Sequence, residues 1–458
     1  MKLTVKEIAK ICDGSLLCGD ENLIIDSYSK DTRTIKQGDC YVGIKGENFD
    51  GNKFWEKAFE KGAKACILDS FEGKLDDDSK YTILLVKNSV EALQTLATYV
   101  REQLNIPVVA VTGSVGKTST KDFISAVLEQ KYKVLKSPGN LNGQIGLPLN
   151  ILSYQDEDVM VLEMGMNDFG QISTLSRIAK PTIAVITNIG TAHIGILGSR
   201  ENILVAKLEI LDGMEKGTPL IINTDNDLLV NLKCEDHSLI TCGILSEAMY
   251  KGRDIQVLDN KTLYQVEYQN QNYSIELPLI GEVFALNSLL AVAVGDLLRL
   301  SKEEIQKGLA NINTSDNHMR IFTLKNKATI IDDCYNSNLE ALKSALKTLI
   351  NFKGKRHIAI LGDILELDSF SKDIHLEIGS LEEIKQLDFL LLTGKDAKYI
   401  QEGALNNNVK QEKILYFSNQ EDLLKELKSL IKEDDVVLVK ASNGMHFKNI
   451  VSSLEEEF

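Results

Sequence analysis

A glycine-rich segment between a buried strand and a helix constrains the fold of this chain more than any other feature. Residues 108–111, Val-Val-Ala-Val, are apolar without alternation, which is typical of a parallel strand buried on both faces. Thr-Gly-Ser-Val-Gly-Lys-Thr-Ser follows at 112–119, and a helical pattern covers 121–128. A strand, a glycine-rich loop and a helix in this order predict a parallel α/β domain that binds phosphate groups.

The chemistry of this loop suits a nucleotide. Glycines let the backbone approach phosphate oxygens, and N–H groups at a helix N-terminus favour an anion. Lys117 would reach the β- and γ-phosphates, and the Thr118 hydroxyl would contact Mg²⁺. The plain alternative is a glycine-rich turn without a ligand. The general spacing would put a glycine where this chain has Val111, so the loop is a shortened form; the chain also lacks an N-K-x-D sequence for guanine.

Length, charge and cysteine usage narrow the class of protein. The 458 residues suit two or three domains of about 100–200 residues each. Lys and Arg number 51 against 66 Asp and Glu, and the net charge of −15 argues against nucleic-acid and anionic-membrane partners. No apolar run approaches the roughly 20 residues that cross a bilayer, and the charged N-terminus lacks a signal-peptide pattern. The seven cysteines are scattered and form no C-x-x-C pair, which supports neither a disulfide framework nor a zinc site. We therefore expect a cytoplasmic protein.

Strand-like runs alternate with helical stretches along the whole chain and predict an α/β fold in three parts. We expect a small N-terminal domain at 1–104, a central, mostly parallel sheet domain at 105–313 and a C-terminal α/β domain at 314–458. Alternating residues on both sides of a polar stretch at 269–272 predict a β-hairpin appended to the central domain. The polar stretch 311–317 is the expected linker, and Ser418 with Glu421 is expected to cap a late helix.

These motifs resemble the Mur ligase family, and within it the ligases that add D-alanyl-D-alanine to UDP-N-acetylmuramoyl-tripeptide. The resemblance runs nearly end to end. The segments that carry it are Asp31–Arg33, Lys45–Gly51, the loop 112–119, Gly139–Asn142, Glu163–Asn167, Asn188–His193, Gly198–Asn202, Ala206–Ile210, Asp332–Asn338 and Leu361–Leu367.

The resemblance implies a reaction and an architecture. Such a ligase uses ATP to convert a carboxylate into an acyl phosphate, which an incoming amine then turns into an amide, in the last cytoplasmic step of peptidoglycan precursor synthesis. The implied architecture places the UDP precursor on the N-terminal domain and ATP on the central one. A Rossmann-like C-terminal domain binds D-Ala-D-Ala and closes on ATP. A monomer is expected, because three domains can enclose the ligands without a partner subunit.

The resemblance also implies functional residues. The expected catalytic residues are Lys117, Glu163, His193 and Lys207, and the expected magnesium ligands are Thr118, Glu163, His193 and Lys207, the last as a CO₂-derived carbamate. ATP is expected at Gly113, Ser114, Val115, Gly116, Lys117, Thr118, Ser119, Asn287, Arg320 and Asp333. The UDP precursor is expected at Thr32, Arg33, Lys45, Asn140 and Asn142, and the incoming dipeptide at Asn336 and Asn338.

The chain departs from the family pattern in three places. Val283-Phe284 replaces a usual His-Asn on the adenine side, Leu339 replaces a proline, and Asn443 replaces an arginine near the incoming dipeptide. Two alternatives stay open: another Mur-type amino-acid ligase, similar to MurE, and a non-catalytic paralogue that binds nucleotide or precursor. The residues do not distinguish diaminopimelate from lysine in the tripeptide, or D-Ala-D-Ala from D-Ala-D-lactate.

Overall fold

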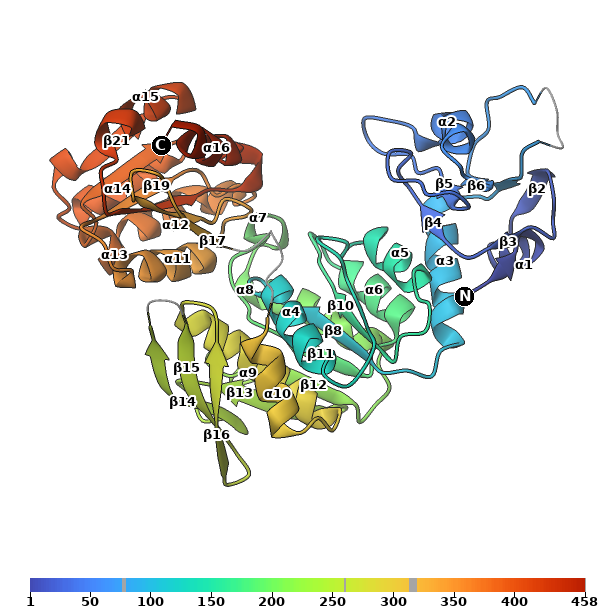
Figure 1. Cartoon of the computed structure of the whole chain (residues 1–458), viewed down its shortest axis with the longest axis horizontal. Helices are drawn as coiled ribbons and strands as arrows, with labels where there is room; N and C mark the ends of the chain where they lie inside the picture. The colour runs from blue at the N-terminus through green and yellow to red at the C-terminus, as the bar shows by residue number, and fades with distance from the viewer. Residues whose placement is uncertain (76–79, 259–260, 313–318, 458) are drawn as a thin grey trace.

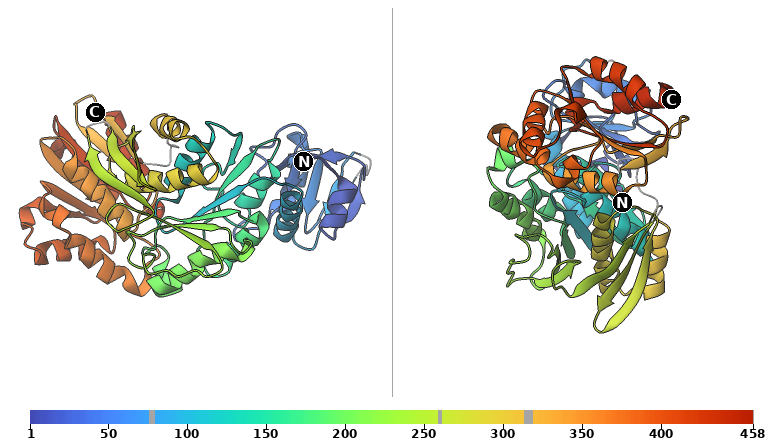
Figure 2. Two further views of the ribbon diagram at one scale, coloured as in Figure 1. Left: turned by 90° about the horizontal axis from the view of Figure 1, so that it is seen from below. Right: turned by 90° about the vertical axis from the view of Figure 1, so that its left-hand side faces the viewer.

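Three separate units, each with its own principal β-sheet, follow one another along the chain. The computed structural model describes residues 1–75, 80–258, 261–312 and 319–457. In Figure 1 the central unit lies between the N-terminal unit (blue) and the C-terminal unit (orange to red). The left view of Figure 2 shows the outer two at opposite ends of an elongated molecule. Any ligand-binding space between units therefore borders the central one.

The N-terminal unit has a mixed sheet of five strands in the order β2-β7-β6-β5-β4 and a separate pair, β1-β3. Its last helix contacts the central unit. The elements are β1 (Leu3–Thr4), α1 (Val5–Ile11), β2 (Ser15–Cys18), β3 (Ile24–Ile25), β4 (Tyr28–Ser29), β5 (Cys40–Val42), η1 (Gly51–Phe54), α2 (Trp55–Glu60), β6 (Ala65–Leu68), β7 (Ile83–Leu85) and α3 (Ser89–Glu102).

A buried arginine fixes α3 onto the central unit. Arg101 is 7% exposed, and its guanidinium donates to the carbonyl oxygens of Ala179 (2.8 Å) and Lys180 (3.2 Å) in the central unit. It also donates to the carbonyl oxygen of Leu104 (2.7 Å), just after α3. A buried charge is tolerated when such bonds satisfy it, so this cluster ties the first two units together.

The central unit is built on one nine-stranded sheet in the order β16-β15-β14-β13-β12-β11-β8-β10-β9. Strands β8 to β14 pair in parallel, and β15 and β16 extend the sheet from β14 with antiparallel pairing. The elements are β8 (Val108–Thr112), α4 (Lys117–Leu128), β9 (Val134–Lys136), α5 (Gly146–Leu152), β10 (Val159–Glu163), α6 (Gln171–Ala179), β11 (Ile183–Ile186), α7 (Ile194–Leu197), α8 (Arg200–Leu208), η2 (Glu209–Gly213), β12 (Pro219–Asn223), β13 (Ser238–Gly243), β14 (Tyr250–Val257), β15 (Thr262–Tyr268), β16 (Gln271–Leu277), α9 (Glu282–Leu297) and α10 (Lys302–Ala310).

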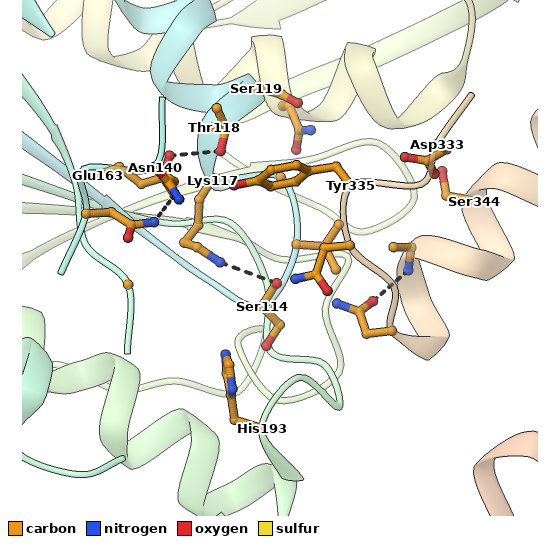
Figure 3. A pocket seen from close by; sticks show the side chains of 18 of the residues that line it. Ser114, Lys117, Thr118, Ser119, Asn140, Glu163, His193, Asp333, Tyr335 and Ser344 are labelled. Atoms are coloured by element: carbon orange, nitrogen blue, oxygen red, sulfur yellow. Dashed lines mark hydrogen bonds between the residues drawn. The ribbon is translucent and has the colours of Figure 1, made fainter. Parts of the chain in front are cut away.

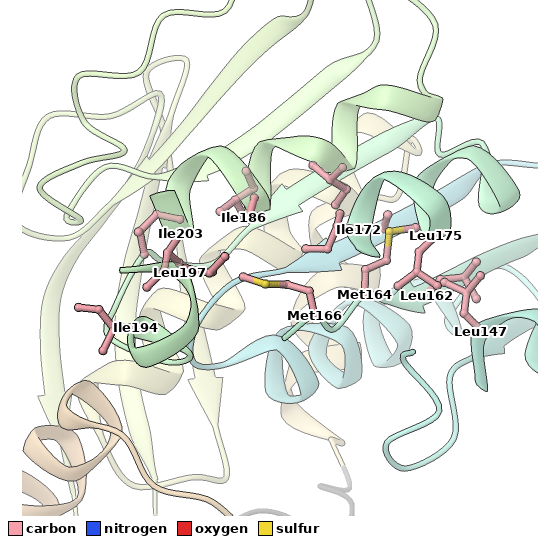
Figure 4. Close-up of a cluster of buried hydrophobic side chains, with 14 of the residues drawn as sticks. Leu147, Leu162, Met164, Met166, Ile172, Leu175, Ile186, Ile194, Leu197 and Ile203 are labelled. Carbon is pink, nitrogen blue, oxygen red and sulfur yellow. The ribbon is translucent and has the colours of Figure 1, made fainter. Parts of the chain in front are cut away.

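The prediction of a buried parallel strand at 108–111 and of the hairpin is confirmed. All five residues of β8 are buried, and β15 and β16 pair through a turn at Gln269 and Asn270, both with positive φ. One buried apolar cluster joins β10 and β11 to α6, α7 and α8, with Ile186, Leu197 and Ile203 among its members (Figure 4). This packing fixes the helices that carry the residues after 193.

The C-terminal unit has a six-stranded sheet in the order β17-β18-β22-β19-β20-β21, parallel except for the edge strand β17. The elements are β17 (Arg320–Thr323), β18 (Thr329–Asp332), α11 (Leu339–Asn351), β19 (Arg356–Leu361), η3 (Asp368–Phe370), α12 (Ser371–Gly379), α13 (Glu382–Lys385), β20 (Phe389–Thr393), α14 (Ala397–Asn406), η4 (Gln411–Lys413), β21 (Ile414–Phe417), α15 (Gln420–Leu430), β22 (Asp435–Lys440), η5 (Asn443–Met445) and α16 (Lys448–Glu457).

Two predictions need comment here. Most of the expected linker, and the domain boundary at 313/314, lie outside the described residues. The predicted cap at Ser418 is wrong: Asn419 is the N-cap of α15, and its side-chain oxygen accepts from the backbone N–H of Asp422 at 2.9 Å. Asn and Ser are similarly good caps, so neighbouring candidates compete.

The helices and the cysteines bear on two of the sequence expectations. Across the described residues, no helix is both long and apolar enough to cross a bilayer. All seven cysteines are free thiols, five of them buried.

Candidate active site

The glycine-rich loop connects β8 to α4, and β8 lies between the parallel strands β11 and β10. Gly113 has φ 149° and Gly116 has φ 80°, a region that L-residues rarely adopt. A Cβ on Gly113 would lie 1.9 Å from Thr187 Oγ1, and one on Gly116 would lie 2.9 Å from the Asn287 amide. Neighbouring atoms therefore require glycine at both positions.

The segment after β11 shapes the loop. The side-chain oxygen of Asn188 accepts from the backbone N–H groups of Ser114 (3.1 Å) and Val115 (2.9 Å). The Ser114 hydroxyl in turn accepts from the N–H of Gly190 at 2.9 Å. The family motif 188–193 therefore has a structural role that sequence reasoning did not predict for Asn188.

Lys117 lies at the first position of α4 and points into the cavity shown in Figure 3. Its ammonium donates to the carbonyl oxygen of Gly113 at 2.8 Å. Burial lowers the pKa of Lys117, and the nearby charge of Glu163 opposes that shift. The Lys117 amine is thus partly desolvated, and an anionic phosphate bound at the loop would favour its charged, ammonium form.

Glu163 ends β10 beside the loop and is 2% exposed. One carboxylate oxygen accepts from the Thr118 hydroxyl at 2.9 Å and the other from the Asn142 amide at 2.7 Å. Thr118 and Glu163, both expected as magnesium ligands, are thus in direct contact. They meet because the carboxyl ends of neighbouring parallel strands share one edge of the sheet.

His193 lines the same cavity and lies below Lys117 and Ser114 in the view of Figure 3. It precedes α7 in a left-handed conformation, φ 65°. Burial lowers the pKa of its imidazole, as do the charges of Lys207 and Lys117, while Glu366 raises it. The neutral ring that results can offer a nitrogen lone pair to a cation.

Lys207 lies near the end of α8 and is 1% exposed. Burial lowers the pKa of its amine well below the ordinary value, and Lys117 lowers it further, against smaller effects of Glu163 and Glu209. The side chain does not line the cavity among the described residues. Burial therefore disfavours the charged form of the Lys207 amine.

A cavity of about 480 Å³ separates the central and C-terminal units and brings most of the predicted residues together. Tyr335 of the C-terminal unit and Asn140 of the central unit both line it. The predicted residues that line the cavity are Ser114, Val115, Gly116, Lys117, Thr118, Ser119, Asn140, Asn142, Glu163, His193, Asn287, Asp333, Asn336 and Asn338. Central-unit and C-terminal residues therefore form one site.

The C-terminal side of the cavity depends on a residue that the sequence did not reveal. Lys440, at the end of β22, donates to the Asp333 carboxylate at 2.6 Å and to the Asn336 carbonyl oxygen at 2.9 Å. Asn338 is the N-cap of α11, and its side-chain oxygen accepts from the N–H of Ala341 at 2.8 Å. The side-chain oxygen of Asn338 is therefore already used in capping this helix.

Six predicted residues do not line this cavity: Gly113 and Lys207 of the central unit, Arg320, and Thr32, Arg33 and Lys45. Arg320 forms ion pairs with Glu455 (3.1 Å) and Asp332 (3.5 Å). Thr32, Arg33 and Lys45 belong to the N-terminal unit, where Arg33 and Lys45 are exposed. Arg33 pairs with Asp31 at 2.6 Å.

The departures from the family pattern are accommodated without loss of local order. Val283 and Phe284 line the cavity, and Phe284 packs edge-on against Phe123 at 6.4 Å. Leu339 is the first residue of α11, a position that also suits proline, and it is buried. Asn443 lines a smaller cavity next to His193 and Glu366.

The donor set suits magnesium that is shared with phosphate groups. The described residues contain no cluster of three or more His, Cys, Asp or Glu side chains that could hold a metal ion. The cavity does present the Thr118 hydroxyl, the Glu163 carboxylate and the His193 imidazole. Mg²⁺ is commonly bound by one or two carboxylates together with substrate phosphates and water, so these few donors fit it.

Comparisons with known proteins agree with this geometry. Three family models match in succession: "Mur ligase family, catalytic domain" at residues 25–101, "Mur ligase middle domain" at 111–295, and "Mur ligase, glutamate ligase domain" at 319–443. The chain belongs to the Mur ligase family.

Individual relatives are similar over nearly their whole length. The UDP-N-acetylmuramoyl-tripeptide–D-alanyl-D-alanine ligase of Bacillus subtilis (strain 168) is 35% identical over 460 residues, which cover 100% of this chain and 99% of that protein. A crystal structure of MurF from Acinetobacter baumannii has a TM-score of 0.88 at 27% identity, covering 100% of this chain and 99% of that one. MurF ligase from Thermotoga maritima in complex with ADP has a TM-score of 0.81 at 29% identity, covering 94% and 97%.

Proposed function

We propose that this chain is the ATP-dependent ligase that joins D-alanyl-D-alanine to UDP-N-acetylmuramoyl-tripeptide, the reaction named for its relatives. The observation that carries the proposal is the cavity that brings Lys117, the Thr118–Glu163 pair and His193 together with Asp333 from the C-terminal unit. Phosphoryl transfer requires positive charge placed near the phosphate oxygens. In this cavity Lys117 can carry such charge, and Glu163 and His193 can bind a cation.

In the first step, a carboxylate oxygen of the precursor attacks the γ-phosphorus of ATP. The bond from that phosphorus to the β-phosphate oxygen breaks, and an acyl phosphate and ADP result. The loop N–H groups and Lys117 bind the phosphates, and we place the nucleotide between Asn287 and Asp333. A bound Mg²⁺ would neutralise charge on the phosphate oxygens, with Thr118, Glu163 and His193 as its protein ligands.

In the second step, the dipeptide amine attacks the carbonyl carbon of the acyl phosphate. The carbon–oxygen bond to phosphate breaks, the amine loses a proton to water, and an amide and inorganic phosphate remain. The C-terminal face of the cavity, around Asn336 and Asn338, would hold the dipeptide. Positioning the amine against the acyl carbon is the main contribution of that face.

We further propose that Lys207 carries a CO₂-derived carbamate. Carbamate formation joins the nitrogen of a neutral amine to the carbon of CO₂ and releases one proton. The burial that lowers the pKa of Lys207 supports this chemistry, because it favours the neutral amine. The resulting anion would stand near His193 and Lys117. The charge of Lys207 lowers the pKa of His193, and the charge of Lys117 lowers the pKa of Lys207.

The proposed domain roles follow the sequence boundaries. Residues 1–104 would bind the UDP precursor, including Thr32, Arg33 and Lys45, and residues 105–313 would bind ATP. Residues 314–458 would bind the dipeptide and close on the nucleotide, bringing Arg320 toward its phosphates. Seven free thiols are compatible with a reducing cytoplasm, and a cavity formed by one chain supports a monomer.

The test is release of inorganic phosphate from ATP with UDP-N-acetylmuramoyl-tripeptide and D-Ala-D-Ala supplied singly and together. We expect full turnover only with both, and mass spectrometry should find the UDP-linked pentapeptide. A Lys117→Ala sample is the matched control for contaminating ATPases. Turnover that ignores both substrates would contradict the proposal. Turnover with UDP-N-acetylmuramoyl-dipeptide and a single amino acid would favour a MurE-like ligase, and no turnover with any pair would favour the non-catalytic paralogue.

A further inference from the structure

A carboxylate of the C-terminal unit contacts the site histidine across the domain interface. Glu366 Oε2 lies 3.0 Å from His193 Nδ1, and the two residues are separated by 173 positions in sequence. Both have left-handed backbones, φ 62° for Glu366 and φ 65° for His193. Non-glycine residues rarely adopt this conformation, and it persists only where the surrounding structure fixes it.

The loop that carries Glu366 is fixed from its first residue. The Asp363 carboxylate accepts from the backbone N–H groups of Lys395 (2.8 Å), Asp396 (3.0 Å) and Ala397 (2.7 Å). These groups belong to the start of α14, and Asp363 itself is 6% exposed. The beginning of the loop is thus attached to a helix of the same unit.

Two further bonds continue to the residue before Glu366. The N–H of Ile364 donates to Nε2 of the fully buried His375 at 3.1 Å, and the N–H of Leu365 donates to the Ser442 hydroxyl at 2.9 Å. Three successive residues, 363 to 365, are each bonded to a different part of the C-terminal unit, so that unit positions the backbone that leads to Glu366.

The segment that carries His193 is fixed equally well. Glu340, in the first turn of α11, accepts from the Thr191 N–H (3.1 Å) and hydroxyl (3.0 Å). A Cβ on Gly195 would lie 2.6 Å from the Glu366 carbonyl oxygen, so the two backbones approach closely. The contact between Glu366 and His193 is therefore part of a continuous docking surface between the two units.

We propose that Glu366 is a positioning residue that accepts the Nδ1–H of His193 and thereby leaves the Nε2 lone pair facing the cavity. Nε2 has no hydrogen-bond partner among the described residues, and His193 lines the cavity. In metal sites, a carboxylate on the far nitrogen fixes the tautomer and orientation of the ligating ring. The role of that lone pair as a magnesium ligand rests on the proposed function, whereas the tautomer does not.

The first test reads the tautomer directly. Nitrogen-15 NMR of histidine-labelled full-length protein, with His193→Gln to assign the ring, should find the proton of His193 on Nδ1. We expect Glu366→Ala to lose that preference and Glu366→Gln to keep it, because the amide oxygen still accepts. Glu433→Ala is the matched control, since Glu433 is similarly exposed (54% against 60%) and its ion pair among the described residues is with Lys327.

An Nε2–H tautomer in the wild type, or an unchanged tautomer in Glu366→Ala, would overturn the proposal. Thermal unfolding checks that the variants fold, and the conservative Gln variant keeps the test valid if the Ala variant does not. The second test measures Mn²⁺ binding in the presence of ADP, by electron paramagnetic resonance. We expect Glu366→Ala to bind Mn²⁺ about 10–100-fold more weakly, with the Gln and Glu433→Ala variants near wild type. A changed tautomer with unchanged Mn²⁺ affinity would support the role of Glu366 and contradict His193 as a metal ligand in the proposed function.

Discussion

Lys440 Nζ lies 2.6 Å from Asp333 Oδ2 at the carboxyl edge of the C-terminal sheet. The register of β18 and β22 explains the contact, because Asp332 pairs with Val439 and the next residue of each strand therefore reaches the same edge. Lys440 is 1% exposed and also donates to the Asn336 carbonyl oxygen. A single buried ammonium thus holds both ends of the 333–336 segment against the cavity.

We expect Lys440→Met to loosen this segment. The Asp333 carboxylate would lose its cation while staying partly buried, which typically costs about 3 kcal/mol of unfolding free energy. KM for ATP should rise more than kcat falls, because the segment binds nucleotide in the proposed site. Urea unfolding and steady-state kinetics measure the two effects. Lys327→Met is the control: its exposed pair with Glu433 should contribute less than about 1 kcal/mol. Equal effects of the two substitutions would contradict a special role for Lys440.

Lys117→Ala tests the phosphate loop. The ammonium stabilises charge that develops on the γ-phosphate, and loss of one such contact typically lowers kcat about 10²–10³-fold. The native fold should persist, since the bonds of this amine within the described part of the chain are to loop carbonyl oxygens. Phosphate release and the melting temperature are the measurements. A variant with near wild-type kcat would show that this loop is not the ATP site.

Much of the site could be predicted because it depends on local patterns. Residues 108–111 and 159–162 are continuous apolar runs, which is typical of buried parallel strands. Parallel strands bring their carboxyl ends to one edge, which places Glu163 beside Thr118. The helix that carries Lys207 was also predictable from a local pattern, because serine is a good N-cap and Ser199 caps α8. Helix periodicity does not say what covers each face, so the burial of Lys207 could be expected only from the carbamate that the family resemblance implies, since CO₂ reacts with a neutral amine.

Contacts between the units could not be predicted from the sequence. Glu366 and Glu340 each have an ordinary surface pattern, and their partners His193 and Thr191 lie 173 and 149 positions away. Such contacts depend on how two separately folded units dock, which leaves no periodic signal in either of them. Caps are uncertain for the opposite reason: at the start of α15, Ser418 and the observed cap Asn419 are adjacent candidates of similar strength.

Alkaline pH should destabilise the C-terminal unit through Cys334. Burial, and its hydrogen bond to Asp332, raise the pKa of this thiol to about 12. An unfolded thiol titrates near 9, so above that pH the unfolded chain releases a proton that the folded chain keeps. The contribution of Cys334 is complete below pH 9 and falls as the pH rises, by about 1.4 kcal/mol per pH unit.

The measurement compares the wild type with Cys334→Ala in urea at pH 8, 9.5 and 10.5, followed by circular dichroism. The variant lacks this titration, so the difference in unfolding free energy between the two proteins should shrink or reverse with rising pH. A difference that stays constant over this range would contradict a buried neutral thiol at 334.

The carbamate on Lys207 is tested by chemical rescue. Lys207→Ala should lose most activity, because an anionic oxygen near the metal ligands disappears, while ATP should still bind through the loop. Short-chain carboxylic acids should restore part of that activity by supplying oxygens in the vacated space. If Lys207 instead acts as a cation on phosphate, small amines should rescue and acids should not. The matched control is Lys117→Ala, whose lost group is a cation in both views, so carboxylic acids should leave it inactive. Rescue of Lys207→Ala by amines alone would contradict the carbamate, and intact-protein mass spectrometry under CO₂ after chemical trapping gives an independent reading of the modification.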